Sequence, residues 1–242
     1  MATKCENCPL RKLKVFDPLT DDEVAFMTRF KTGELSVEAG SQLLMDGSNS
    51  PQLFTALSGM GLRYKTLEDG RRQVVNFVFP GDFLGMQAGI MGEMQHSVEA
   101  TTRMTLCVFS RNDIWSLFKS HPSRAFDLTW VAATEEHFLG DALATIGQRT
   151  AIERIAWAMV RIFARGKSLG MTSGQTMPLP YRQQDLADAL GLSLVHTNKT
   201  IAKLRERQTM SWHDGKLHVM KLEELAAIAQ CETDDLKRRP LI

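Results

Sequence analysis

The pattern of apolar and polar positions divides the 242-residue chain into a strand-rich first half and a helical second half. Between about residues 31 and 110, apolar residues come in short runs separated by turn dipeptides such as Asp69-Gly70 and Pro80-Gly81. Many short strands at nearly regular spacing predict an all-β barrel or roll. The candidate strands are residues 43–45, 53–57, 62–66, 73–79 and 104–109.

Helical periodicity flanks the predicted roll on both sides. Before it, Thr20 and Glu23 have the spacing of a capping box, which predicts a helix ending near Phe30. After it, the predicted helices are residues 112–119, 122–146 and 148–165. The second of these is the longest, and its apolar surface is too broad for one neighbour to cover. Part should pack on the roll and part on a partner, by default a second copy in a homodimer.

Residues 182–207 predict two further short helices joined by a tight turn. Leu186 and Leu190 give the first helix an apolar face, and Gly191 follows at once, where a helix end favours a residue that tolerates positive φ. Ser193 offers a hydroxyl to cap the second helix. This is the sequence form of a helix-turn-helix, whose second helix enters the major groove of DNA.

Polar side chains on the outer face of that second helix predict the DNA contacts. Asn198 can read adenine, Lys199 can reach the acceptors of guanine, and the other cations can pair with phosphates. An ordinary helical hairpin with a solvated basic face is the alternative. The candidate DNA-contacting residues are Arg182, Gln183, Ser193, Val195, His196, Asn198, Lys199, Lys203 and Arg205.

The next segment favours DNA binding over that alternative. In residues 211–220, Asp214-Gly215 lies between two short β-like runs, which predicts a hairpin. A hairpin directly after a helix-turn-helix is the wing of a winged-helix domain. The formal net charge of only +1 argues against a uniformly basic DNA coat, so the affinity for DNA must come from a local patch.

Composition and the absence of certain motifs argue against other classes of function. With 43% hydrophobic and 24% charged residues the chain is ordinary for a globular protein. No apolar run approaches the roughly 18 residues of a membrane span, and the N-terminus lacks the apolar core of a signal peptide, so a cytoplasmic protein without membrane association is expected. No nucleophile motif, P-loop or dense histidine and carboxylate cluster is present, and we therefore expect no enzyme.

The order of these elements resembles the CRP/FNR family of bacterial transcription regulators. The similarity is carried by GSQLLMDGSNSPQLFTALSG, EDGRRQ, FPGDFLG and the helix-turn-helix with its wing. It implies an α+β protein: a β-roll like the cyclic-nucleotide-binding jelly roll, a long dimerisation helix and a C-terminal winged helix-turn-helix. It also implies a homodimer that senses an effector, binds a palindromic operator in double-stranded DNA and acts on RNA polymerase. The expected parts are residues 1–30, 31–120 (roll), 121–148 (dimerisation helix) and 149–242 (DNA-binding domain).

Two places in the roll depart from the members of the family that bind cyclic AMP. Those members have an acid after the glycine of the FLG turn and an Arg-Ser pair further on, whereas this chain has Met86 and His96-Ser97. Losing a carboxylate and a guanidinium removes the charge-assisted hydrogen bonds that hold such a ligand. Dependence on cyclic AMP is therefore not expected, and Gly85, Met86, His96 and Ser97 remain candidates for a pocket for another, unknown small-molecule effector.

The cysteines invite comparison with the FNR branch, which holds a four-iron cluster on three N-terminal cysteines and one in the roll. Cys5, Cys8 and Cys107 lie in comparable places, but the third N-terminal cysteine is missing. A cluster would need a fourth ligand other than cysteine. A thiol switch at Cys5 and Cys8, or cysteines with no regulatory role, are the alternatives, and a lone Cys-x-x-Cys is weak for zinc.

The second helix of the helix-turn-helix also departs from the familiar members. They carry Glu and Arg four residues apart, where this chain has Val195 and Lys199. Val195 can touch a thymine methyl but cannot accept from cytosine, so a different operator is expected. Thr197 stands at an inward position that usually holds Val or Ile, and should cost packing or bond back to a carbonyl.

Overall fold

The computed structural model describes residues 2–233 and 237–242 and divides the chain into two compact units. The N-terminal unit consists of Met1–Glu135 and Arg238–Ile242, and the C-terminal unit of Glu136–Lys237. None of the described helices is both long and apolar enough to cross a membrane.

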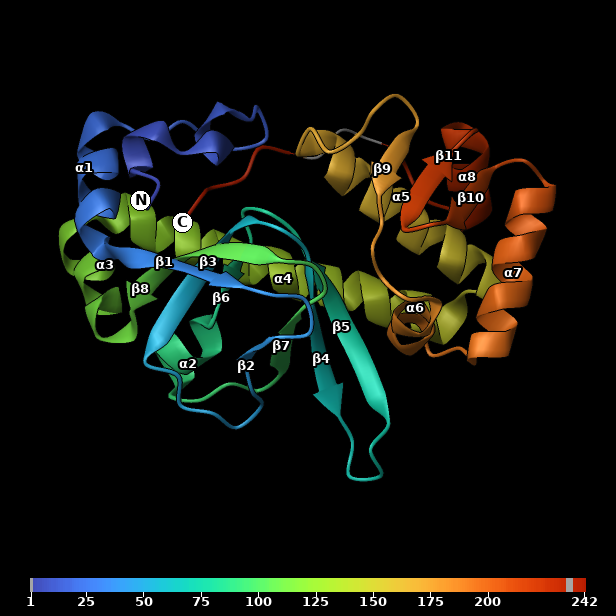
Figure 1. The fold of residues 1–242 in the computed structure, drawn as a ribbon, viewed down its shortest axis with the longest axis horizontal. Coiled ribbons are helices and arrows are strands. Elements are labelled where there is room, and N and C mark those ends of the chain that lie inside the picture. Colours follow the sequence, from blue (N-terminus) through green and yellow to red (C-terminus); the bar gives the residue numbers. More distant parts are fainter. Residues whose placement is uncertain (1, 234–236) are drawn as a thin grey trace. The chain divides into compact units, whose positions relative to one another are not determined.

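Two four-stranded antiparallel sheets make the roll of the N-terminal unit (Figure 1). One has the order β1-β8-β3-β6 and the other β2-β7-β4-β5. The strands are β1 (Lys31–Val37), β2 (Gln42–Leu44), β3 (Gln52–Ser58), β4 (Gly61–Thr66), β5 (Arg72–Val78), β6 (Phe83–Leu84), β7 (Ser97–Ala100) and β8 (Met104–Ser110). The predicted roll is therefore confirmed, including all five predicted strands to within a residue or two.

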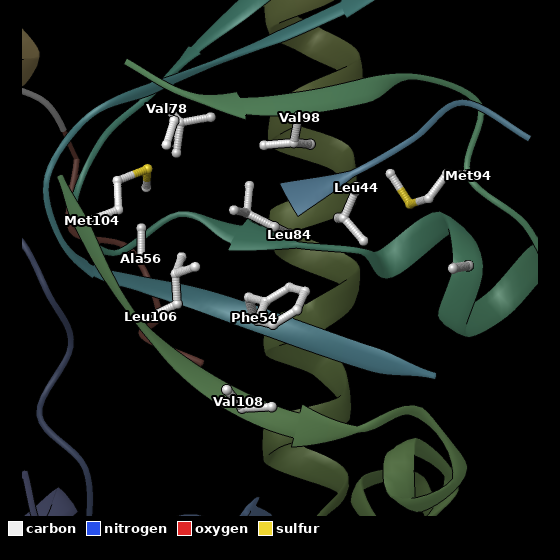
Figure 2. Packing of buried hydrophobic residues seen from close by; sticks show 12 residues of the cluster. Leu44, Phe54, Ala56, Val78, Leu84, Met94, Val98, Met104, Leu106 and Val108 are labelled. Carbon is white, nitrogen blue, oxygen red and sulfur yellow. The ribbon is translucent and has the colours of Figure 1, made fainter. Parts of the chain in front are cut away.

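The inner faces of the two sheets meet in one apolar core. Phe54 of β3 and Leu106 of β8 face Val78 and Val98 of the opposite sheet, with Leu84 between them (Figure 2). Leu106, Val78 and Val98 have no exposed surface. Burial on this scale is the main contribution to the stability of the unit.

Three strands and one helix of the roll were not predicted. β6 has two residues and β7 four, which is too short for a visible alternation, and β1 is a mostly polar sequence that pairs along β8. Helix α2 (Met86–Met91) begins at Gly85, whose φ of 93° is a conformation that glycine alone adopts easily.

Helices cover the outer side of the β1-β8-β3-β6 sheet. α1 (Asp21–Phe30) has the predicted capping box, because Thr20 Oγ1 accepts from the Glu23 amide at 3.2 Å and the Thr20 amide donates to Glu23 at 2.9 Å. Phe30 of α1 stacks on Phe109 of β8. The remaining helices of this part are η1 (Cys5–Asn7), η2 (Pro9–Lys12), η3 (Arg111–Asp113), α3 (Ile114–Ser120) and α4 (Pro122–Gln148), of which α4 crosses the boundary between the units.

The C-terminal unit packs helices against a small three-stranded sheet. Its elements after α4 are α5 (Ala151–Ser168), β9 (Thr176–Pro178), α6 (Gln183–Leu190), α7 (Leu194–Glu206), β10 (Met210–His213), β11 (Lys216–Val219) and α8 (Leu222–Ala229). The sheet has the order β10-β11-β9, which is the architecture of a winged helix-turn-helix. β9 adds a third strand that three residues of sequence could not predict.

The last five residues differ from the expected domain division. Residues 149–242 were expected to form the DNA-binding domain, yet Arg238–Ile242 belongs to the N-terminal unit. The physical reason is that Leu241 and Ile242 are buried there, at 6% and 4% exposure. Such a return of the chain depends on a long-range fit that no local pattern encodes.

Candidate nucleic-acid interface

The turn between α6 and α7 has the geometry that the sequence predicted. Gly191 ends α6 in the left-handed region, with a φ of 63°, and the Leu192 amide donates to the Ala187 carbonyl at 3.1 Å. The hydroxyl of Ser193 accepts from the His196 amide at 3.2 Å and so caps α7. These contacts fix where α7 begins, and therefore which residues its outer face presents.

Helix α7 has one buried face and one exposed face. Ile201 and Leu204 are 6% and 0% exposed and pack into the unit, whereas Val195 on the other side is 64% exposed. The exposed side chain of Val195 can contact a thymine methyl. The predicted contact residues that the structure leaves exposed are Arg182, Ser193, Val195, His196, Asn198, Lys199, Lys203 and Arg205, and Gln183 is half-buried.

Asp185 holds the start of α6 together. Its side chain is 1% exposed and accepts from the Arg182 amide at 2.8 Å and from the Arg182 guanidinium at 2.8 Å. A bound guanidinium loses less conformational freedom on meeting a phosphate than a mobile one. Arg182 is thus positioned by its neighbour, a role that the spacing of the sequence did not reveal.

The wing is a tight hairpin. Asp214 and Gly215 both have positive φ, 51° and 67°, as the two central residues of a type I′ turn require. The indole of Trp212 donates to the Leu179 carbonyl at 3.1 Å and anchors β10 to the segment before α6. The predicted wing is present, and a buried aromatic side chain holds it.

A hollow of about 350 Å³ lies beside the first residues of α5 and is one part of the surface that the sequence analysis missed. The N-terminus of this 18-residue helix carries a partial positive charge. Lys203 of α7 and Arg207, which follows the helix, line the other side, so positive charge borders the hollow from two elements. The lining residues are Thr150, Ala151, Ile152, His196, Thr200, Lys203 and Arg207.

A second hollow, of about 180 Å³, lies between α6, α7 and the first strand of the wing. It combines polar side chains with one guanidinium, a composition that suits a phosphate or a base edge. Its lining residues are Gln183, Asn198, Ile201, Ala202, Arg205, Trp212 and His213.

Thr197 and Thr200 are both buried on the inner side of α7, but only one hydroxyl has a partner in the described part of the chain. Thr200 donates to the His196 carbonyl at 2.8 Å. Thr197 is fully buried and its hydroxyl meets no partner, so the expected bond back to a carbonyl is not formed there. The cost of Thr197 at this position is therefore the desolvation of an unpaired hydroxyl.

We expect Thr197→Val to raise the free energy of unfolding of the C-terminal unit by about 1–2 kcal/mol, because it removes a buried hydroxyl that lacks a partner. Thr200→Val is the matched control and should lower that free energy by about 1 kcal/mol, since it removes a satisfied hydrogen bond. Urea denaturation of both variants measures the two changes. Equal effects of the same sign would contradict the assignment.

In the N-terminal unit, the four candidate pocket residues make contacts within the roll or begin one of its helices. Met86 packs against the apolar cluster under α1, and Ser97 accepts from the Asp46 amide at 3.0 Å. Gly85 starts α2. Burial, followed by the charge of Arg63, lowers the pKa of His96 to about 4. His96 is therefore neutral at pH 7.

Cys5, Cys8 and Cys107 lie close enough together to influence one another's charge, around Lys31. Burial raises the pKa of Cys5, and raises the pKa of Cys107 to about 11, so that thiol is protonated at neutral pH. The ammonium of Lys31 is already bound by the Thr3 carbonyl and Glu34. Among the residues that the structure describes, no three His, Cys, Asp or Glu side chains are arranged to hold a metal ion. This donor set does not fit a four-iron cluster.

The fold and the interface define a class of protein: a winged-helix DNA-binding protein with a β-roll as its second unit. A cyclic nucleotide-binding domain model matches residues 34–121, and a Crp-like helix-turn-helix domain model matches residues 153–228. The chain belongs to the CRP/FNR family of bacterial transcription regulators, in its FixK-like branch, and is a DNA-binding transcription regulator.

Three comparisons carry this assignment. The nitrogen fixation regulation protein FixK of Rhizobium meliloti is 32% identical over 78% of this chain and 83% of its own length. The transcriptional activator protein FnrL of Cereibacter sphaeroides is 26% identical over 96% and 93%. The solved structure of FixK2 from Bradyrhizobium japonicum has a TM-score of 0.73 at 22% identity, over 81% of this chain and 96% of that one, which supports the fold.

Proposed function

We propose that the chain acts as a homodimer that binds a palindromic operator, with α7 of each copy in the major groove. The observation that carries this proposal is the exposed face of α7, where Val195 and Lys199 lie between the two hollows and Asn198 lines the second. Side chains between two phosphate-binding regions are placed to meet base edges while the flanking cations meet the backbone. Each copy reads one half-site.

The seam for a second copy lies along α4. Thr129, Ala132, Glu136, Leu139 and Leu143 are all exposed and follow the alternating spacing of three and four residues that a coiled coil uses. The other side of the helix is occupied, because Leu128 is buried in the N-terminal unit and Phe138 stacks on Trp157 of α5. Leu143 is 73% exposed in one chain, and a twin helix would cover it.

Operator binding in this proposal does not depend on cyclic AMP. The neutral His96 and the apolar Met86 leave a cyclic phosphate without its usual charged partners. The space near His96 also holds an ion pair of the protein itself: Arg63 lies 3.2 Å from Glu135 of α4, and Asn76 donates to the same carboxylate at 2.9 Å. This cluster joins the roll to α4 without a ligand.

The bound dimer would act on RNA polymerase. Activation is the expected direction, because the relative FnrL is named a transcriptional activator. Selection of bound sequences from a random DNA pool would give the operator, and transcription in vitro from a promoter carrying it would give the direction of the effect. Binding that shows no sequence preference would contradict the proposal.

The roles within α7 are testable with two single substitutions. We expect Lys199→Ala to lose about 1–3 kcal/mol of binding free energy and to relax specificity at one base pair per half-site, because Lys199 reaches a base edge. Arg205→Ala should weaken all sequences alike and reduce the salt dependence, because Arg205 meets phosphate. Binding titrations on the operator and on single-base variants, at several salt concentrations, measure both. A uniform loss in both variants would show that Lys199 does not read a base.

A further inference from the structure

The tail segment, residues 238–242, is seated on the N-terminal unit by its backbone. The Arg239 amide donates to the Val15 carbonyl at 2.8 Å, and the Asp17 amide donates to the Arg239 carbonyl at 2.9 Å. Arg239 thus forms a parallel bridge with Phe16. Figure 1 shows the C-terminal end of the chain beside the strands of this unit.

The side chain of Arg239 lies in a site formed by Asp82, Gly81 and the ring of Phe16. Its guanidinium lies 3.1 Å from Asp82, both side chains are only 12% exposed, and it stands over the ring of Phe16. Gly81 makes room for that ring, since a Cβ atom at Gly81 would come within 2.2 Å of it. A carboxylate beside an aromatic ring binds a guanidinium through an ion pair and a cation–π contact, and so favours arginine at this place.

The end of the tail segment meets two buried polar groups and an apolar cluster. Arg124 of α4, 2% exposed, donates to the Leu241 carbonyl at 2.7 Å, and Thr55 of β3, also 2% exposed, donates to the Ile242 carbonyl at 2.5 Å. The Ile242 side chain belongs to the core cluster that contains Phe30, Leu53, Phe83 and Leu128.

From these contacts we propose that the N-terminal unit carries a peptide-binding groove for the sequence Arg-Pro-Leu-Ile, and that residues 239–242 occupy it as a clasp. Donors from β3 and α4, an acceptor from the turn before β6 and an apolar floor converge on this one segment. Exposed tails with little to bury have no such complement of buried polar partners.

The clasp gives the chain a second covalent connection between its two units. The first is α4, and the second runs from α8, which ends at Ala229, through residues 230–237 to the docked segment. The clasp also holds the first turns of α4 to the roll through Arg124. Releasing it adds conformational freedom that DNA binding must then remove, which lowers the affinity.

Two adjacent arginines provide the test. In the full chain, Arg239→Ala should lower the melting temperature of the N-terminal unit by several degrees, and Ile242→Asp by roughly 5 °C or more. Arg238→Ala is the matched control, because Arg238 is exposed and should leave the melting temperature unchanged. If Ile242→Asp fails to fold, the melting temperature of the milder variant Arg239→Ala still tests whether the segment stabilises the N-terminal unit.

The groove itself is tested with a peptide. A labelled peptide of residues 237–242 should bind saturably to the full-length Ile242→Asp variant at micromolar concentration and raise its melting temperature. The same peptide with aspartate in place of Ile242 should not. Melting temperatures equal to that of Arg238→Ala, together with no peptide binding, would overturn the groove.

The effect on DNA rests on the proposed function. Arg239→Ala should bind the operator several-fold more weakly than Arg238→Ala, and unchanged or tighter binding would overturn the coupling. The peptide assay contains no DNA, so a failure of the proposed function leaves the groove testable.

Discussion

The double variant Leu139→Asp/Leu143→Asp is expected to be a monomer and to lose at least 100-fold in affinity for the operator. Two carboxylates on the exposed seam of α4 would face their copies across the dimer, where burying them is costly. A monomer reads only one half-site, and losing the second contact commonly costs a factor of 10² to 10⁴. This is the largest effect that a change remote from DNA should produce.

Sedimentation at micromolar concentration measures the assembly, and binding titrations on the full operator and on a single half-site measure the affinity. The control is Leu67→Asp, because Leu67 is also an exposed leucine, at 52%, but lies in the loop between β4 and β5. That variant should remain a dimer and bind normally. A wild-type protein that is monomeric while binding its operator specifically would refute the homodimer, as would an aspartate double variant that still dimerises.

The parts of the fold that the sequence predicted well are those that local chemistry determines. Gly191 and Ser193 mark the turn of the helix-turn-helix because each satisfies a backbone requirement within a few residues. Asp214-Gly215 marks the wing for the same reason. In the roll, short alternating or apolar runs predicted β3, β4, β5 and β8, whose inward residues reach the core. The two-residue β6 is too short to show such a pattern.

Features that depend on contacts between residues far apart in the chain could not be predicted from the sequence. Thr150 lines a hollow with residues of α7 only because the fold brings the start of α5 beside that helix. Burial raises the pKa of the Cys107 thiol to about 11, a consequence of packing that the place of Cys107 in the sequence did not reveal. The burial of Ile242 connects residues far apart along the chain, and it could be found only from the structure.

Acidification should destabilise the N-terminal unit through His96. Burial and Arg63, and more weakly Lys65, lower the pKa of this imidazole from 6.5 to about 4, while Glu135 and Asp46 act in the opposite direction. The folded state therefore binds the proton less well than the unfolded state. The contribution of neutral His96 to the free energy of unfolding is fully present above pH 6.5. It is lost as the pH falls from 6.5 to 4, and it amounts to at most about 3 kcal/mol.

A difference measurement isolates this contribution from the carboxylates that also titrate in acid. The difference in the free energy of unfolding between the wild type and His96→Gln should be constant above pH 7. Between pH 6.5 and pH 4 it should shift by a growing amount against the wild type. His137→Gln is the control for the substitution, because the side chain of His137 is 75% exposed and lies in α4, outside the roll. Hydrogen exchange of the β4 and β7 amides assigns the loss to the roll. Parallel curves for wild type and His96→Gln would show that His96 takes up its proton without opposing the fold, and that this corner of the roll is open to solvent.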